Sequence, residues 1–404
     1  MAGPVGSYGG RRRLGPFPFS ARFPYPLVTP VDRTPDSTDM RLPLLHTLRF
    51  ARGWSSPPTD LVEEEIRIPA IGGGEPTSGT LLSPPDPGPL PGWVVLHGIT
   101  RRGRRHPALR RFIEALAATR ARILVPEITE WIRLDLAPGR AQAIIRGAIE
   151  TLSRRPDVEA GGVVVAGFSF GGPQALYAAQ SPGTSDQVRG VLAWGSYADL
   201  ESTLHFHFTG EHGEGLHEPP DPYGRWVVGH NCLPHLEGRG DLTGVAAALH
   251  RLAAFAGDEA VDSRSPAMDP LKAELRQGLA PGNRELFDLF APPAGVPPER
   301  EAAVELVGEL TRVALSTYPL LDPIPLLGHL DCPVRLLHGR DDILIPCTQL
   351  PVLERRLAPH THDLRTGLTG LFAHSAGGSE LGPLDRARES VHFLRVLRRA
   401  FQLV

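Results

Sequence analysis

Residues 167–171 have the pattern Gly-x-Ser-x-Gly, with Ser169 at the centre. A serine hydroxyl attacks a carbonyl carbon only when a base takes its proton and hydrogen-bond donors stabilise the developing oxyanion. A run of valines (163–165) predicts a strand before the motif, and residues 172–180 predict a helix after it. A tight turn between such elements exposes the serine oxygen, and the two glycines leave room for the turn. Ser169 is therefore a candidate nucleophile.

Backbone donors for an oxyanion are expected at two turns. The chain contains 44 glycines, so the serine pattern alone could arise by chance in a glycine-rich turn. The N–H of Phe170 would face the start of the helix that follows Ser169. His97-Gly98 ends a predicted strand, and a sharp turn there would direct the N–H of Ile99 above the serine. We expect Phe170 and Ile99 to form an oxyanion hole.

Three carboxylates could orient a base. Asp341 and Asp342 follow a predicted strand in the stretch HGRDDILIP, and Asp199 follows an earlier strand. A loop at a strand end directs only one of two adjacent carboxylates inward, so the other faces solvent or caps a helix. A carboxylate in this position holds an imidazole in the correct orientation and stabilises its cation.

The candidate base is His374, in a loop beyond the last predicted strand. The other late histidines fit less well, because they precede that strand or lie in the terminal helix (His360, His362 and His392). The order Ser169, Asp342, His374 places each residue after the carboxyl end of a predicted strand, which is a known order for a catalytic triad. A histidine in a loop is otherwise usually a solvated surface group.

Apolar strands alternate with amphipathic helices from residue 91 to about residue 198. Strands that are apolar on both faces predict a mostly parallel sheet with helices on both sides. The alternation stops after residue 198 and resumes at residue 332, with mostly helical patterns between. We therefore predict an α/β core at 40–199 and 331–404, interrupted by a helical cap insertion at 200–330. Residues 1–39 are rich in Pro, Gly and Arg and predict a disordered arm, with either Met1 or Met40 as the true start.

These stretches together resemble the α/β-hydrolase superfamily, in its capped serine-hydrolase branch. GFSFGG is similar to the nucleophile elbow, LHGIT to the oxyanion strand, and LFAHS to the histidine loop. HGRDDILIP is similar to the acid loop, in which an aspartate stands three residues after a glycine and a proline follows four later. The resemblance selects Asp342 and covers about residues 60–402, except the cap.

The resemblance implies an esterase-like enzyme that uses Ser169, Asp342 and His374 and needs no cofactor or metal. The substrate would be a small-molecule ester. The same triad could instead cleave an amide, a thioester or a carbon–carbon bond, and a non-catalytic binding module could keep the fold. A haloalkane dehalogenase is disfavoured, since that enzyme needs a carboxylate in place of Ser169.

Two charged segments stand outside this scheme. The stretch RRGRR (101–105) could line an entrance for an acidic substrate, but a solvated charged loop is the simpler interpretation. Six histidines crowd residues 205–235, and His205-x-His207 would place two imidazoles on one face of a strand, as in a metal site. The segment is rich in Gly and Pro, however, so we expect a polar lid containing DPYGRW (221–226) rather than a metal site.

Composition restricts the remaining possibilities. A net charge of −3 argues against nucleic-acid binding, which needs a concentrated basic surface. The three cysteines have no spacing typical of zinc or of a disulfide framework. No apolar run reaches the ~20 residues that a membrane span needs, and prolines interrupt the N-terminal region where a secretory signal would lie. We therefore expect a cytoplasmic protein without a membrane partner.

Overall fold

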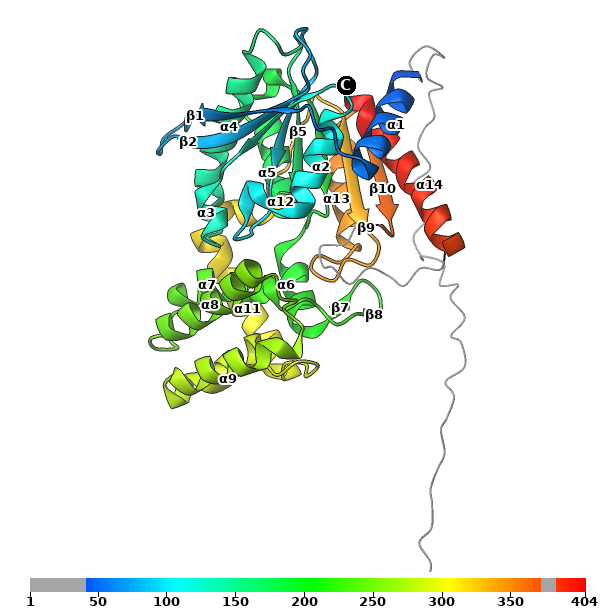
Figure 1. Cartoon of the computed structure of the whole chain (residues 1–404). Coiled ribbons are helices and arrows are strands. Elements are labelled where there is room, and N and C mark those ends of the chain that lie inside the picture. The colour runs from blue at the N-terminus through cyan, green and yellow to red at the C-terminus, as the bar shows by residue number, and fades with distance from the viewer. Residues whose placement is uncertain (1–40, 372–382) are drawn as a thin grey trace, which may run out of the picture. The chain divides into compact units, whose positions relative to one another are not determined.

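The computed structural model describes residues 41–371 and 383–404. Eight strands form one sheet in the order β1-β2-β4-β3-β5-β6-β9-β10 (Figure 1). β1 and β2 are antiparallel, β2 pairs antiparallel with β4, and all other neighbours are parallel. The strands are β1 (Val62–Ile68), β2 (Thr77–Ser83), β3 (Gly92–Leu96), β4 (Arg122–Pro126), β5 (Val163–Phe168), β6 (Val188–Trp194), β9 (Val334–Gly339) and β10 (Leu364–Thr369).

Helices cover both faces of this sheet. Every residue of β3 and β4 is buried, because both faces of these central strands are covered. One face packs on α1 (Arg41–Ser55), α2 (Pro107–Ala117) and α14 (Pro383–Ala400) through a cluster that includes Trp93, Val95 and Phe112. The other face packs on α4 (Pro138–Ser153), α5 (Gly171–Gln180) and α13 (Gln349–Leu357).

A long helical segment is inserted between β6 and β9, which are adjacent parallel strands. Figure 1 shows most of its helices gathered beyond the end of the sheet to which β9 and β10 point. The segment contains α6 (Leu200–Thr209), α7 (Tyr223–Cys232), α8 (Thr243–Glu259), α9 (Asp269–Gly278), α10 (Arg284–Phe290), α11 (Arg300–Thr317), α12 (Pro323–Leu326) and the short hairpin β7 (Glu211–His212) and β8 (Leu216–His217).

The predicted α/β-hydrolase fold is confirmed, including the hairpin near the start and the mostly parallel sheet. The alternative in which His205 and His207 project from one face of a strand is wrong, because both residues lie on helix α6. The predicted polar lid also differs, because Asp221, Arg225 and Trp226 of DPYGRW are buried.

Candidate active site

Ser169 occupies a strained turn between β5 and α5. Its backbone φ is 54°, in the left-handed region that costs a non-glycine residue about 1 kcal/mol or more. The turn is held by hydrogen bonds from Ser169 N to Trp194 O (2.8 Å) and from Gly172 N to Ser169 O (2.9 Å). A Cβ on Gly167 would overlap the carbonyl of Gly171 and lie 2.8 Å from the Cα of Gly172. The glycine before the serine is therefore required by the close approach of the helix.

The turn after β3 passes directly beside Ser169. A Cβ built on Gly98 would lie 3.3 Å from the Cβ of Ser169 and 3.8 Å from its Oγ. Ile99 and Ser169 line the same cavities, and Phe170 stands at the N-terminal boundary of α5. The structure therefore brings both residues with predicted oxyanion-hole N–H groups next to the candidate nucleophile.

A buried histidine orients the peptide group between Gly98 and Ile99. The Nδ1–H of His97 donates to Gly98 O (2.7 Å), and Ile128 N donates to His97 Nε2 (3.3 Å). Burial lowers the pKa of His97 to about 4, so the ring is neutral near pH 7. Because Gly98 O and the N–H of Ile99 belong to one planar peptide unit, fixing the oxygen also fixes the direction of the N–H. From its sequence, His97 is expected only to end a strand, and its place next to the turn glycine is the signal that could have indicated this role.

The adjacent carboxylates Asp341 and Asp342 have opposite environments. Asp341 is exposed to solvent, whereas Asp342 is 2% exposed. The Oδ1 atom of Asp342 accepts hydrogen bonds from Leu344 N and Ile345 N, both at 3.0 Å. Its Oδ2 lies 3.7 Å from Nε2 of the buried His338. Two backbone donors therefore fix the orientation of this carboxylate at the strand end.

Two candidates remain, Asp199 as an alternative acid and His374 as the base. Asp199 caps α6, because its carboxylate accepts a 2.7 Å hydrogen bond from Ser202 N, which is a common structural role for aspartate. His374 lies outside the described residues. Of the three carboxylates considered, only Asp342 shares a cavity with Ser169.

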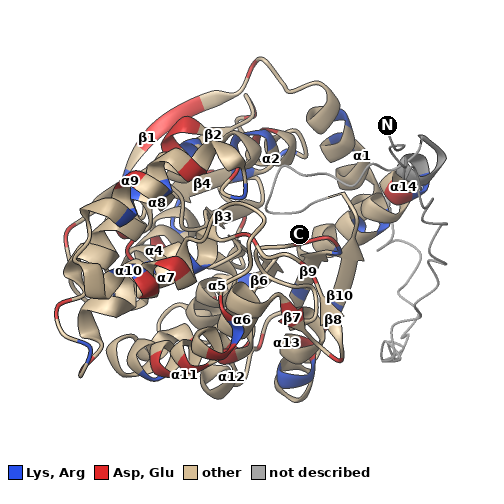
Figure 2. Cartoon of the chain, turned by 90° about the horizontal axis from the view of Figure 1, so that it is seen from below, with Lys and Arg blue, Asp and Glu red and all other residues tan. Residues whose placement is uncertain are grey.

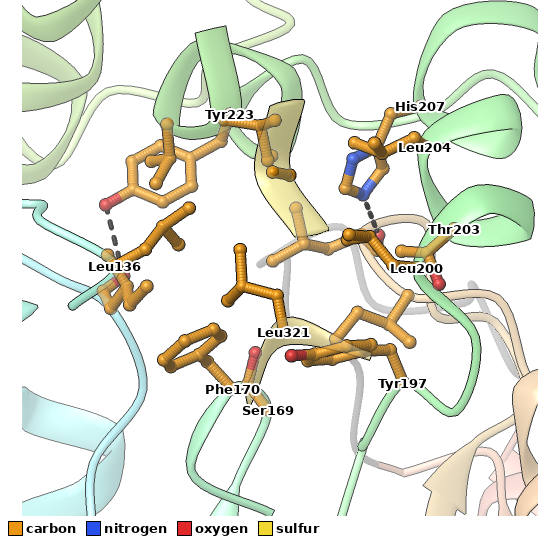
Figure 3. Close-up of a pocket in the computed structure, with 17 residues that line it drawn as sticks. Leu136, Ser169, Phe170, Tyr197, Leu200, Thr203, Leu204, His207, Tyr223 and Leu321 are labelled. Carbon is orange, nitrogen blue, oxygen red and sulfur yellow. Dashed lines mark hydrogen bonds between the residues drawn. The ribbon is translucent and has the colours of Figure 1, made fainter. Parts of the chain in front are cut away.

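Two cavities meet at Ser169. The first, here called the large cleft, has a volume of about 640 Å³ and is lined by Asp342, Asp221 and Arg102 among others. The second, here called the small cavity, has a volume of about 100 Å³ and lies between Ser169 and the inserted helices (Figure 3). The two share Ile99, Ser169, Tyr223 and Leu344. The described residues that line the small cavity are Ile99, Leu136, Ser169, Phe170, Tyr197, Leu200, Thr203, Leu204, His207, Tyr223, Gly224, Val227, Val228, Ala314, Leu321, Leu344 and Ile345.

The inserted helices donate hydrogen bonds to two loops near Ser169, the turn after β3 and the loop after β9. The hydroxyl of Tyr223 donates to Ile99 O (3.2 Å), and Nε2–H of His207 donates to Leu344 O (2.7 Å), as the dashed lines in Figure 3 mark. Burial lowers the pKa of His207 to about 4, so this donor is a neutral imidazole near pH 7. Sequence reasoning missed both residues. Their partners lie 124 and 137 positions away along the chain, so no local pattern marks them.

The arginine-rich stretch 101–105 is not a simple solvated loop, so that interpretation is wrong. Arg104 is 7% exposed and pairs with Glu65 (3.0 Å) and Glu127 (2.8 Å). Arg101 pairs with Asp258 near the end of α8 (3.1 Å). These ion pairs join the turn after β3 to strand β1 and to the inserted helices. Figure 2 shows how basic and acidic residues are distributed over the chain.

The clustered histidines have protein partners. His205 Nε2 lies 3.3 Å from Oε2 of Glu211, and His212 Nδ1 lies 3.2 Å from Oγ1 of Thr348. Within residues 41–371 and 383–404, no group of three His, Cys, Asp or Glu side chains is arranged to hold a metal ion. No helix in the same ranges is both long and apolar enough to cross a bilayer.

Comparisons with known proteins support the fold. Neither a protein-family model nor a curated protein matches the sequence. A ligand-bound structure of the rice cell wall degrading esterase LipA from Xanthomonas oryzae matches with a TM-score of 0.52 and 14% identity, over 87% of this chain and 93% of that one. Brefeldin A esterase, a bacterial homologue of human hormone sensitive lipase, gives a TM-score of 0.46 and 18% identity, over 93% and 88%.

The Pyrococcus horikoshii acylaminoacyl peptidase also matches, with a TM-score of 0.45 and 12% identity over 87% of this chain. This chain spans only 43% of that peptidase. The strand order, the turn at Ser169 and the LipA match together define the α/β-hydrolase fold.

Proposed function

We propose that this chain is a serine hydrolase that cleaves a carboxylic ester through an acyl-enzyme. The observation that carries the proposal is the strained Ser169, which opens into the same cleft as the buried, backbone-bonded Asp342. A non-glycine residue held at positive φ is a common feature of functional sites, because the surrounding structure must compensate the strain. The matched esterase LipA favours the same reaction class.

In the proposed mechanism, Ser169 Oγ attacks the ester carbonyl carbon while His374 takes its proton. Asp342 holds the imidazole and stabilises its positive charge, without itself becoming protonated. The N–H groups of Phe170 and Ile99 stabilise the oxyanion, and His97 keeps the second of these directed toward it. The imidazolium then protonates the leaving alcohol. In the second half of the reaction, His374 takes a proton from water while the water oxygen attacks the acyl carbon. The imidazolium then returns a proton to Ser169 Oγ, and the acid is released.

A fluorophosphonate probe tests this proposal most directly, because it reacts only with activated serines. We expect labelling at Ser169 in the purified chain, together with hydrolysis of p-nitrophenyl butanoate. Ser169→Ala should lose both, whereas Ser181→Ala, at the C-terminal end of the same helix, should keep both. Unlabelled Ser169 with no hydrolysis would favour a binding module on this fold. Labelling with hydrolysis of amides but not esters would reassign the bond.

A further inference from the structure

The two cavities on either side of Ser169 differ in size and in polarity. The small cavity, of about 100 Å³, is walled by apolar side chains of the inserted helices, including Leu204 and Val227. None of the described residues that line it is Asp, Glu, Lys or Arg, and its imidazole, His207, is neutral near pH 7. The large cleft, of about 640 Å³, contains ionisable side chains from several elements.

The position of Asp342 decides which part of a substrate enters each cavity. During acyl transfer, the base gives its proton to the leaving-group oxygen, so the leaving group lies on the side of the base. Asp342, which would orient that base, lines the large cleft and not the small cavity. The leaving alcohol therefore belongs in the large cleft. The acyl group, which stays bonded to Ser169, belongs in the small cavity.

The volume and lining of the small cavity restrict the acyl group. A protein cavity of about 150 Å³ lined by apolar side chains holds a benzene molecule. On the same scale, a volume of about 100 Å³ holds about four carbon atoms. A carboxylate or ammonium group placed here would lose its hydration without gaining an opposite charge, which is strongly unfavourable.

We infer that the substrates are esters of short, uncharged, apolar acids with a larger alcohol. This inference rests on the proposed function and adds the direction in which the ester binds. In Figure 3, Phe170 and Tyr197 lie beside Ser169, while Leu200, Leu204 and His207 lie toward the inserted helices. The inserted helices thus limit the length of the acyl group, and the turn at Ser169 closes the opposite end of the small cavity.

The first experiment compares two isomeric esters, benzyl butanoate and propyl phenylacetate. The enzymatic kcat/KM of each ester is divided by the rate constant for its hydrolysis by hydroxide, which corrects for intrinsic reactivity. The alcohol part carries the phenyl ring in benzyl butanoate, and the acyl part carries it in propyl phenylacetate. We expect kcat/KM to be at least tenfold higher for benzyl butanoate, because its small group enters the small cavity. A preference for propyl phenylacetate, or equal rates, would overturn the assignment.

The second experiment follows acyl length and charge with p-nitrophenyl esters from acetate to dodecanoate. We expect kcat/KM to be highest at about four carbons and to fall at least tenfold by decanoate. The p-nitrophenyl monoester of succinate, which has four acyl carbons and a terminal carboxylate, should react at least 100-fold more slowly than the butanoate. A rate that rises through decanoate, or equal rates for this pair, would contradict the inference.

A variant pair links the length limit to the cavity wall. Leu204→Ala enlarges the small cavity and should move the optimum toward longer acyl groups, whereas Leu326→Ala, at an exposed position on α12, should leave it unchanged. The wild-type measurements stand by themselves if Leu204→Ala does not fold. Absence of all ester hydrolysis together with an unlabelled Ser169 would overturn the proposed function as well. Activity with the reverse preference would overturn this inference alone.

Discussion

The central strands β3 and β4 are buried along their whole length, whereas the inserted helices add polar side chains that hydrogen-bond to the loops after the strands. Tyr223 and His207 donate to backbone carbonyls beside Ser169, and Asn231 donates to Leu134 O (2.9 Å) while accepting from Leu136 N (3.0 Å). His250 adds a contact to Arg133 O (3.0 Å).

This difference separates two tasks. The loops at the ends of the strands carry the candidate residues Ser169 and Asp342, and the inserted helices fix the loops around them and form walls of the small cavity. Buried polar side chains suit the second task, because irregular loops leave carbonyl groups that no strand or helix satisfies.

The largest effect is expected at the acid. Asp342→Asn removes the charge that would stabilise the imidazolium, and we expect kcat to fall by roughly 10³- to 10⁴-fold. Asp341→Asn is the matched control, since that side chain is exposed, and its kcat should change less than twofold. Steady-state kinetics with p-nitrophenyl butanoate measure both. Equal losses would contradict the assignment of Asp342.

Acid should destabilise the sheet and the inserted helices together, through His97 and His207. Burial lowers the pKa of each to about 4, while the unfolded value is about 6.5. As the pH falls below 6.5, the unfolded chain takes up protons first. The free energy of unfolding is therefore fully retained above pH 6.5 and declines toward pH 4, by at most ~1.4 kcal/mol per pH unit for each imidazole.

Urea unfolding between pH 7 and pH 5 measures this dependence. His207→Gln should reduce the slope with pH, because one titrating group is removed. Gln277→Asn changes an exposed side chain that does not ionise and should leave the slope as it is. Identical slopes for wild type and His207→Gln would show that this imidazole does not resist protonation.

A smaller effect is expected where α7 packs against His207. A Cβ on Gly224 would lie 2.6 Å from Nε2 of His207, which is the atom that donates to Leu344 O. Gly224→Ala should therefore cost about 1–3 kcal/mol of unfolding free energy and reduce kcat. Gly308→Ala lies on α11 with open space around the added carbon and should stabilise the protein by about 0.5–1 kcal/mol. Chemical denaturation compares the two, and equal changes would argue against a packing effect at Gly224.

The smallest effect is expected from the hydroxyl of Tyr223. Tyr223→Phe removes the hydrogen bond to Ile99 O, and we expect about 1 kcal/mol of lost stability with a kcat roughly tenfold lower at similar KM. Tyr177→Phe is the control. Its buried hydroxyl has no partner among the described residues, so its removal should be neutral or stabilising. An unchanged kcat in Tyr223→Phe would show that the inserted helices do not position this loop.

The alternation of apolar strands and amphipathic helices was enough to predict the sheet, because parallel strands covered on both faces need an unbroken apolar pattern. The start of the inserted segment was less predictable. A strand that carries His205 and His207 is one alternative that the sequence leaves open, but both residues lie on a helix that is stabilised by long-range packing and by the hydrogen bond from His207 to Leu344 O. Tertiary contacts override weak local preferences in such segments.

Local spacing and apolar periodicity were sufficient to predict the fold class, the turn that carries Ser169 and the order of the candidate residues. The burial of Asp342 and the exposure of Asp341, the orientation of the peptide before Ile99 by His97, and the two unequal cavities at Ser169 could be seen only in the folded chain. Those properties depend on side chains brought together from distant parts of the chain, and the volume between them is set by packing rather than by pattern.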